Sequence, residues 1–576
     1  MFLTLDKVAD RTTYDVVVVG SGAGGMAAAV FAAIAGRKVL VVERTEYVGG
    51  TSALSAATTW APNTHHAKSV PGDDSFEKAK RFLDGAVGNH SSAALREAFL
   101  MSAPEAIATL ESRTDVQFRP YATHPDYEQQ HEGATMRGRA LEPVPFDGRQ
   151  LGEGLNYLRP PHPEFTVFGG MMIDRTDINH MLGIRKSAKS FAHAVKILGH
   201  YGLDRLVGRR GSRLVMGNAL IGRMLLTLQK QGVTILTRTS PKAFLSDDGG
   251  VSGLVLESDG VRRSVLATSG VVLAAGGFGR GPRRAGMLPQ PTPQYSPAAP
   301  GHTGEMQELA LGLGARFGES NADNAFWAPV SVRKRKDGTR AVFPHFVMDR
   351  SKPGTVCVNQ AGERFTNESS SYHLFGRAMF EANKTSPCIP CYLVTDAEGL
   401  RKYGLGMVRL TDRDYAPFIA DGYLVEGRTI ADLEKKLEIP GGALERTVAD
   451  MNEFARTGVD LQFGRGTTDY HRVNGDATAA AGPNPTLGWI KTGPFYAVRL
   501  YPGDIGAATG LVIDEWARVT KADNMPIGRL YACGNEANSI MGGVYPGPGI
   551  TIGPAIVFAY RAIQNALGLA EKSHVA

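Results

Sequence analysis

The hydrophobic pattern near the N-terminus predicts a strand, a helix and a second strand in quick succession. Residues 15–19, DVVVV, form a continuous apolar run rich in β-branched side chains, which is typical of a strand buried on both faces. The small-residue segment MAAAVFAAIAG then predicts a helix, and KVLVVE predicts a second strand that ends at Glu43. Two doubly buried strands joined by a helix belong to a parallel sheet, so we expect an α/β fold.

The turn between the first strand and the helix carries the pattern G-x-G-x-x-G at residues 20–25. Glycines there let the backbone approach a pyrophosphate, and the start of the helix supplies positive potential. Glu43 stands 18 residues after the last glycine, where it would accept from ribose hydroxyls, while Arg44 beside it could equally be a solvated surface charge. The dinucleotide contacts predicted here are Gly20, Gly22, Ala23, Gly24, Gly25, Glu43 and Arg44.

Three further segments favour FAD over a nicotinamide nucleotide. GGTS at 49–52 is a second glycine loop with hydroxyls, suited to a second pass along a long cofactor. VVLAAGGFG at 271–279 and GRLYACGNEA at 528–537 predict buried strands, so the contacts are spread over both ends of the chain. No histidine follows the 49–52 loop closely, so we expect noncovalent FAD. The predicted contacts are Gly50, Thr51, Ser52, Ala275, Gly276, Gly277, Gly534 and Asn535, with Glu536 as a local cap.

Composition narrows the class of protein. The 576 residues contain 43% hydrophobic and 21% charged positions, as in a soluble globular protein of two domains. The net charge of +6 is small for this length, and no segment resembles a nucleic-acid-binding module. The longest small-residue apolar stretch has 13 residues, short of the roughly 20 that a membrane span needs. Four cysteines and no secretory signal predict a reducing, cytoplasmic location, with Cys388 and Cys391 at a strand start rather than in a redox pair.

The excess positive charge is concentrated between Met181 and Val215. A local charge of +7 arises there from Arg185, Lys186, Lys189, Lys196, Arg205, Arg209, Arg210 and Arg213 against Asp204. Phe191, Val195 and Leu198 fall on one helical face. The segment is therefore either an amphipathic helix that docks on anionic lipid at the inner membrane, or a solvated helix packed on the cofactor domain.

These motifs resemble those of the flavoprotein class that includes fumarate reductases and 3-ketosteroid dehydrogenases. The resemblance covers nearly the whole chain, through DVVVVGSGAGGMAAA, VVERTEYVGGTSALS, VVLAAGGF and LYACGNEA. Within the class, YPGPGITIGPA at 545–555 is similar to the steroid Δ1-dehydrogenase pattern Tyr-Pro-Gly-x-Gly followed by Gly-Pro-Ala. The resemblance implies a Rossmann-like FAD-binding domain from residues 1–295 and 497–576, with an inserted α+β catalytic domain at 296–496.

The same resemblance implies a reaction, the introduction of a double bond between carbons 1 and 2 of an apolar 3-ketosteroid. The Tyr545 hydroxyl and the Gly549 N–H would hold the keto oxygen, and Gly553 and Pro554 would open a helix toward the flavin. The hydride would pass to the flavin, and a quinone or another electron acceptor would then reoxidise it.

The proton acceptor falls on Tyr372, within RFTNESSSYHLFGRAM. A supporting tyrosine falls on Tyr127. The family pattern has His-Pro after this tyrosine, whereas here His124 and Pro125 precede Tyr127, so Tyr121 competes for the same role. An unperturbed phenol is only about one part in a thousand ionised at neutral pH. We therefore expect Tyr127 to lower the pKa of Tyr372, and turnover to rise toward alkaline pH.

Other functions remain as alternatives. A steroid Δ4-dehydrogenase would use similar tyrosines, whereas a fumarate-type reductase needs an arginine and histidine clamp that the tyrosine and glycine positions do not supply. A flavin-binding membrane protein without catalysis would be expected to lack Tyr372 or Tyr545, and both are present. His65 and His66 have no acid or cysteine at ligand spacing in the sequence, so no metal site is predicted.

Overall fold

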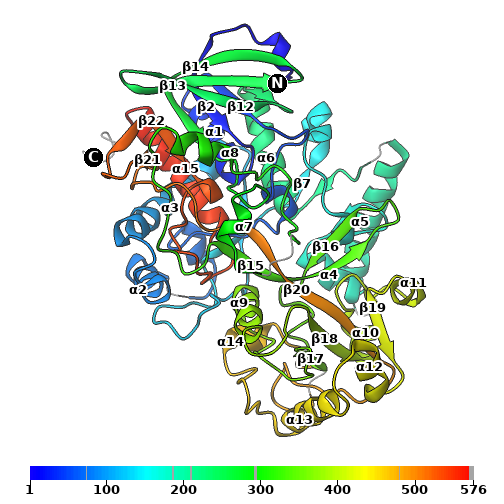
Figure 1. Ribbon diagram of the computed structural model, residues 1–576. Coiled ribbons are helices and arrows are strands. Elements are labelled where there is room, and N and C mark those ends of the chain that lie inside the picture. The colour runs from blue at the N-terminus through cyan, green and yellow to red at the C-terminus, as the bar shows by residue number, and fades with distance from the viewer. Residues whose placement is uncertain (73, 185–186, 208–209, 291–294, 479–480, 570–576) are drawn as a thin grey trace.

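Two β-sheets organise the chain, as the computed structural model in Figure 1 shows. The structure describes residues 1–576 except 73, 185–186, 208–209, 291–294, 479–480 and 570–576. The first sheet follows the order β1 (Phe2–Leu3), β11 (Thr234–Leu236), β3 (Val39–Val42), β2 (Thr12–Val19), β14 (Val261–Leu273), β13 (Gly250–Ser258) and β12 (Ser240–Asp247). Two more strands belong to it, β22 (Pro526–Ala532), which pairs with β14, and β21 (Arg518–Thr520), which pairs with β22.

The predicted strand, helix and strand at the N-terminus are confirmed. β2 and β3 pair in parallel from Val16–Val39 to Val19–Val42, and these residues are fully or almost fully buried. Helix α1 (Ala23–Ile34) crosses between them and packs against α6 (Met216–Lys230) and α15 (Ile552–Ala566). Its small side chains are what allow two helices to pack so closely on it.

The two ends of the chain meet in this sheet, as the sequence predicted. Val271–Leu273 of β14 pairs in parallel with Leu530–Ala532 of β22 on one side and with Val17–Val19 of β2 on the other. The carboxyl ends of β2, β14 and β22 therefore lie side by side. Ligands of open parallel sheets bind at this edge.

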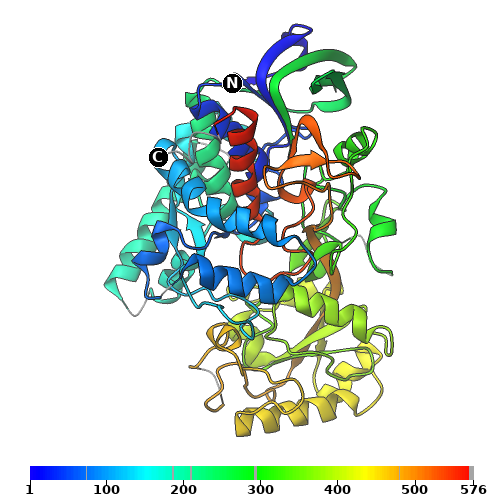
Figure 2. The same ribbon diagram turned by 90° about the vertical axis from the view of Figure 1, so that its left-hand side faces the viewer.

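The second sheet is antiparallel and lies at the other end of the molecule, where Figure 2 gathers the yellow and light-green segments. Its strands are β16 (Arg340–Pro344), β15 (Ala325–Lys334), β20 (Phe495–Ala507), β18 (Cys391–Asp396) and β17 (Thr355–Val358), with β19 (Leu424–Gly427) also paired to β20. The helices around it include α9 (Tyr372–Ala382), α10 (Ala397–Tyr403), α12 (Ile430–Leu437) and α13 (Ala443–Thr457). A mixed α/β architecture is thus confirmed.

The predicted domain limits of 296 and 496 stay a prediction. All strands of the second sheet fall between Ala325 and Ala507, and β20 runs through the predicted exit at 496. Since β20 pairs with β15 at one end and with β18 at the other, a boundary there would divide a strand that the sheet needs.

Two further predictions concern the cysteines and helices that could span a membrane. Cys391 begins β18 as predicted, and the four cysteines are buried with free thiols. Among the helices of the described residues, none has both the length and the apolar character that crossing a bilayer demands.

Candidate active site

A cavity of about 920 Å³ opens along the carboxyl edge of the first sheet and extends to the second. This volume lies in the upper part of the range for ligand sites, roughly 300–1,000 Å³. Most predicted cofactor residues line it: Gly20, Gly22, Ala23, Gly24, Glu43, Arg44, Gly50, Thr51, Ser52, Ala275, Gly276, Gly534 and Asn535. Residues far apart in the sequence are therefore brought to one surface, as the FAD hypothesis requires.

Four predicted cofactor residues, Gly25, Gly277, Gly553 and Pro554, do not line the cavity. A Cβ at Gly25 would lie 2.0 Å from the Gly20 carbonyl oxygen, and one at Gly553 would lie 1.9 Å from that of Trp60. The Gly277 N–H donates to Glu536 at 2.9 Å. The glycines are thus required by backbone packing behind the cavity, which a sequence pattern alone does not separate from ligand contact.

The nucleotide end of the cavity fits a pyrophosphate and a ribose. Helix α1 starts at this wall with Gly22 as its N-cap and no side-chain cap, so its electropositive first turn faces the cavity. The Ala23 N–H donates to the Ser52 hydroxyl at 3.0 Å, which ties the two predicted glycine loops together. The Glu43 carboxylate lies at the predicted place and accepts from the Ser21 hydroxyl at 2.5 Å.

Arg44 is not a solvated charge. Its guanidinium donates to the Thr303 hydroxyl and forms an ion pair with Glu305 at 3.2 Å. Arg44 also lines the cavity, and its role in binding the cofactor stays a prediction.

His302 and Arg159 line the same wall, and the sequence analysis missed both. The His302 Nε2 lies 3.2 Å from the Thr51 hydroxyl, and burial lowers the pKa of this imidazole to about 4, so it is neutral. Neither His302 nor Arg159 belongs to a short motif, so only the folded chain reveals them.

Glu536 caps the local backbone, because its carboxylate accepts a hydrogen bond from the Gly277 N–H. Burial raises the pKa of Glu536 to about 7.

The three predicted tyrosines meet at the far end of the cavity. Tyr127 donates its hydroxyl hydrogen bond to the Tyr372 hydroxyl at 3.4 Å. The ring centroids of Tyr372 and Tyr545 lie 5.1 Å apart, and the Tyr127 and Tyr545 rings stack at 6.0 Å with 13° between their planes. The three residues come from distant parts of the chain, and each lines the cavity.

Tyr127, and not Tyr121, is the residue beside Tyr372. The Tyr127 N–H donates to the Pro546 carbonyl at 2.7 Å, which fixes Tyr127 next to the stretch that carries Tyr545. The Tyr121 hydroxyl lies instead 3.3 Å from the Thr58 hydroxyl. The geometry therefore separates the two candidates that the sequence left open.

Gly549 presents a free backbone N–H to the cavity. Its φ of +88° suits glycine, and a Cβ would lie 2.2 Å from the Thr58 carbonyl oxygen. Its carbonyl accepts from Trp60 N–H at 3.2 Å and from Gly553 N–H at 3.0 Å. Within the described residues no acceptor takes the Gly549 N–H, so it is available to a ligand oxygen beside Tyr545.

The expected lowering of the Tyr372 pKa is wrong for this structure. Burial is the largest cause, and with the neighbouring Tyr127 and Tyr545 phenols it raises the pKa of Tyr372 well above 10. Desolvation disfavours the charged phenolate, and the hydrogen-bonding contacts with the two neighbouring phenols act in the same direction in the resting site. One feature acts the other way: Tyr372 is the first residue of α9, where the helix end favours negative charge.

His65 and His66 have an acidic neighbour in the folded chain, contrary to the expectation from their spacing in the sequence. Folding brings the Glu111 carboxylate to 3.1 Å from His65 Nε2 and 2.9 Å from His66 Nε2. The three side chains could hold a metal ion, although His65 is exposed. Glu111 lies 45 residues beyond His66, on α3 (Ala93–Arg113), so spacing in the sequence could not reveal it.

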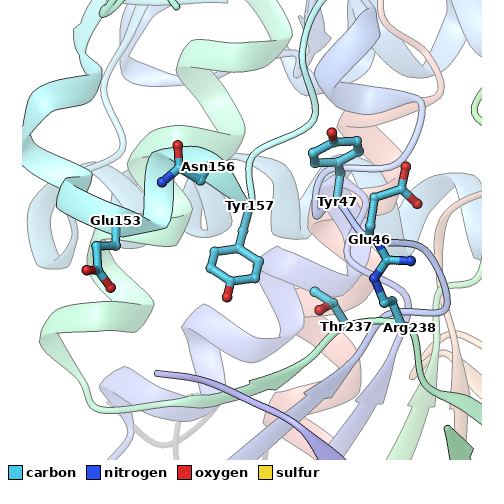
Figure 3. A pocket seen from close by; sticks show the side chains of 7 residues that line it. All are labelled: Glu46, Tyr47, Glu153, Asn156, Tyr157, Thr237 and Arg238. Atoms are coloured by element: carbon cyan, nitrogen blue, oxygen red, sulfur yellow. The ribbon is translucent and has the colours of Figure 1, made fainter. Parts of the chain in front are cut away.

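A second, smaller hollow of about 360 Å³ lies apart from this cavity (Figure 3). Its walls are Glu46, Tyr47, Glu153, Asn156, Tyr157, Thr237 and Arg238. It contains none of the predicted site residues, so the large cavity is the candidate active site.

Comparison with known proteins agrees with this assignment. A family model described as FAD binding domain matches residues 15–552. The chain is 36% identical over 562 residues to the 4-oxocyclohex-2-ene-1-carboxylate 5-dehydrogenase of Sinomonas cyclohexanicum, covering 96% of this chain and 94% of that protein. It is 32% identical over 575 residues to the 3-oxosteroid 1-dehydrogenase of Mycolicibacterium smegmatis, covering 97% and 98%.

Solved structures that are similar over nearly the whole length include one at 33% identity. It is the 3-ketosteroid Δ1-dehydrogenase of Sterolibacterium denitrificans in complex with 1,4-androstadiene-3,17-dione. The TM-score is 0.90 at 33% identity, with 97% of this chain and all of the other covered.

Proposed function

Because the chain belongs to the FAD binding domain family, whose model matches residues 15–552, we propose that it is an FAD-dependent dehydrogenase of 3-ketosteroids. It introduces the double bond between carbons 1 and 2, next to the keto group. The observation that carries this proposal is the meeting of Tyr127, Tyr372 and Tyr545 beside the free Gly549 N–H in the large cavity. The named relatives that act on ring ketones support it.

The reaction needs a polarised carbonyl and a proton acceptor. The Tyr545 hydroxyl and the Gly549 N–H belong to one stretch that lines the cavity, in which Pro546 and Pro548 restrict the backbone. Together they hold the keto oxygen and stabilise the negative charge that develops on it. This makes the hydrogens on carbon 2 acidic enough for Tyr372 to remove one.

Tyr127 supports the base through its hydroxyl. The hydrogen bond that it donates to Tyr372 stabilises the phenolate once the proton has moved, and the start of α9 favours the same charge. The aromatic walls, including Phe346 at 4.9 Å from the Tyr372 ring, exclude water from the reacting atoms. When bound, FAD supplies the acceptor for the hydride that leaves carbon 1.

A second candidate substrate is a small oxocyclohexane carboxylate, as the name of the Sinomonas relative suggests. The extent of the apolar lining favours a larger molecule. Besides the tyrosines, the lining includes Met172, Ile178, Met181, Val347 and Met348, which is more apolar wall than one six-membered ring can cover. We therefore retain the steroid as the principal proposal.

We expect androst-4-ene-3,17-dione to bleach the bound flavin anaerobically. Its carbons 1 and 2 carry the hydrogens that the site would remove, whereas succinate, the electron donor of the fumarate couple, has no ketone for Tyr545 and Gly549 to hold. The measurement is the loss of flavin absorbance after rapid mixing, with the product identified by mass spectrometry. A 5α-saturated 3-ketone that gives a Δ4 product would favour the Δ4-dehydrogenase instead, and bleaching by succinate with none by the steroid would reject the proposal.

The protein would also dock on anionic lipid through α5 (Ala188–Val207). One face of this helix is buried through Ala194, Ile197 and Tyr201, and the last two pack with Met171. The opposite side exposes large apolar side chains, including Phe191 at 57% and Leu206 at 84%, along with Val195, Leu198 and Leu203. A solvated helix has no physical reason to present such a face.

The charge near this helix is smaller than the sequence count suggested. Arg210 donates to the Leu158 carbonyl at 2.7 Å, and Arg213 pairs with Asp177 at 2.8 Å, so both are structural. Arg185, Lys186 and Arg209 lie outside the described residues. Lys189, Lys196 and Arg205 are exposed beside the apolar face, as lipid docking requires.

Docking places the cavity near the bilayer, because α4 (Arg175–Leu182) and the loop before it line the cavity and pack beside α5. An apolar ketone dissolved in lipid, and a quinone as electron acceptor, would both be within reach. The location that follows is cytoplasmic and peripheral on the inner membrane.

Replacing Phe191 and Leu206 together by glutamate should reduce sedimentation with phosphatidylglycerol vesicles at low salt by about tenfold or more, because two apolar contacts become charged. Val459 and Leu461, exposed at 54% and 82% outside this segment, give a matched control when changed to glutamate. Equal loss in both double variants, or no loss in the first, would reject the docking face.

A further inference from the structure

One part of the cavity wall carries a cation. Arg175 is the first residue of α4, and it lines the cavity together with Ile178 and Met181 of the same helix. We propose that Arg175 binds a carboxylate on the substrate, at the end remote from the keto group. This inference rests on the proposed function and deepens it, since it makes the preferred substrate a ring ketone that is also an acid.

The guanidinium of Arg175 has no partner in the described part of the chain. No carboxylate there lies within 4.0 Å of it, and it makes no hydrogen bond to a described residue. The other arginines that line the cavity differ in this respect. Arg44 pairs with Glu305 at 3.2 Å, Arg159 donates to the Thr45 hydroxyl at 2.7 Å, and Arg409 donates to the Glu164 carbonyl at 3.0 Å.

The acids of the substrate part of the cavity are already engaged elsewhere. Glu142 pairs with Arg119 at 2.7 Å, and Glu164 pairs with Arg335 at 2.8 Å. Asp174, the neighbour of Arg175 in the chain, lies 3.5 Å from the Arg119 guanidinium. The positive charge of Arg175 is therefore not cancelled locally, and an arriving anion meets no competitor for it.

The charge of Arg175 acts on the inside of the cavity. Burial lowers the pKa of His124 to about 3, and the positive charge of Arg175 is the second cause of that shift. Burial and the negative charge of Glu142 raise the pKa of Tyr121 to about 12, and the charge of Arg175 opposes this rise. Both residues line the cavity, so the field of the guanidinium extends along the wall toward the tyrosines. His124 is consequently neutral and does not offer a second cation.

Part of the cavity lining is apolar. Met172, Val347 and Met348 belong to it, and none of them can pair with a charge. A ligand that satisfies the whole cavity therefore has a ketone at Tyr545 and Gly549, a ring system in the middle and an anion at Arg175. A planar guanidinium recognises a carboxylate through two parallel hydrogen bonds, and one positive charge balances one carboxylate.

The test compares an acid with its ester. 3-Oxochol-4-en-24-oic acid and its methyl ester share the rings and the ketone and differ only in charge. In the wild-type holoenzyme we expect kcat/KM for the acid to exceed that for the ester by about fivefold to tenfold, since Arg175 is solvent-exposed and the pair is partly screened. Raising the salt concentration should shrink the ratio.

Arg175→Gln should bring the acid-to-ester ratio to about one, and Arg175→Lys should keep part of it. The ratio cancels any general effect of the substitution on folding or flavin binding. Arg262→Gln, which removes a cation of β14 that is not in the cavity lining, should keep the wild-type ratio. Binding is measured separately with the 1,4-diene product of the acid, which cannot reduce the flavin in this reaction. Its dissociation constant, obtained from the change in the flavin spectrum of the oxidised enzyme, should rise by the same factor in Arg175→Gln.

An equal acid-to-ester ratio in the wild type and in Arg175→Gln would overturn the assignment. Failure of the proposed function would look different: neither compound, nor neutral androst-4-ene-3,17-dione, would bleach the flavin of the wild type. The neutral ketone thus separates the absence of steroid chemistry from the absence of anion recognition.

Discussion

Replacing Tyr372 by phenylalanine should lower kcat by about 10²- to 10⁴-fold, because the change removes the general base and leaves its ring. FAD should stay bound, since Tyr372 lies in the tyrosine cluster and not among the nucleotide contacts. Single-turnover flavin reduction measured by stopped flow isolates this chemical step. The ring contacts with Phe346 and Tyr545 remain in the variant, so a folding defect is not expected.

The pH dependence gives the same variant a second readout. The pKa of Tyr372 is raised above 10, so the fraction of phenolate grows almost tenfold for each unit of pH between neutrality and pH 9. The rate of flavin reduction in the wild type should rise with pH over that interval, and Tyr372→Phe should lose this slope. A flat wild-type profile, with chemistry limiting, would contradict the role of Tyr372.

Tyr470→Phe is the matched control for Tyr372→Phe. The Tyr470 ring packs 4.9 Å from the Tyr127 ring and is buried, but its hydroxyl has no hydrogen-bond partner among the described residues. Losing that hydroxyl should change the rate of flavin reduction by less than about threefold, since no hydrogen bond is lost. A loss as large as that of Tyr372→Phe would show that any phenol of this cluster matters equally.

Replacing Tyr545 by phenylalanine should lower the rate of flavin reduction by about 10²- to 10³-fold, the usual cost of losing one donor to a developing oxyanion. The Gly549 N–H would remain, so some activity should survive. Unlike Tyr372→Phe, this variant should keep the dependence on pH, because the base is intact. Steady-state kinetics from neutral to alkaline pH measure both the loss and the slope.

Tyr121→Phe serves as the comparison for Tyr545→Phe. Tyr121 also lines the cavity, but its hydroxyl lies near Thr58 rather than in the tyrosine cluster. A much smaller loss than for Tyr545→Phe is expected. Gly549→Ala is a poor substitute for either test, because its Cβ would collide with the Thr58 carbonyl and displace the whole stretch. Equal losses in Tyr121→Phe and Tyr545→Phe would argue against a specific oxygen-binding role for Tyr545.

The features that sequence predicted well are those with a local physical cause. Val16–Val19 can only be buried on both faces, and the glycines of residues 20–25 can only serve close backbone approach. Both therefore appear where the sequence places them. The distinction between Gly22, which lines the cavity, and Gly25, which packs on Gly20, depends on neighbours that the pattern does not contain.

The features that sequence analysis missed depend on contacts between distant segments. Glu111 reaches His65 and His66 only after α3 folds back, and the engagement of Arg210 and Arg213 reduces a charge that counting had treated as free. The direction of the Tyr372 pKa shift was also mistaken. Burial is the largest cause of the rise in this pKa, and burial is a property of the assembled cavity.

The backbone hydrogen bond from Tyr127 to Pro546 has a mechanical consequence. It joins the supporting tyrosine to the stretch that holds the keto oxygen, so Tyr127 and Tyr545 form one unit with the first sheet. Tyr372 comes from α9, which packs on β15 of the second sheet. The 3.4 Å hydrogen bond between the Tyr127 and Tyr372 hydroxyls therefore connects the parts of the chain that belong to the two sheets. A small sliding of the second sheet against the first would move the Tyr372 hydroxyl away from Tyr127 without moving the groups that hold the ketone.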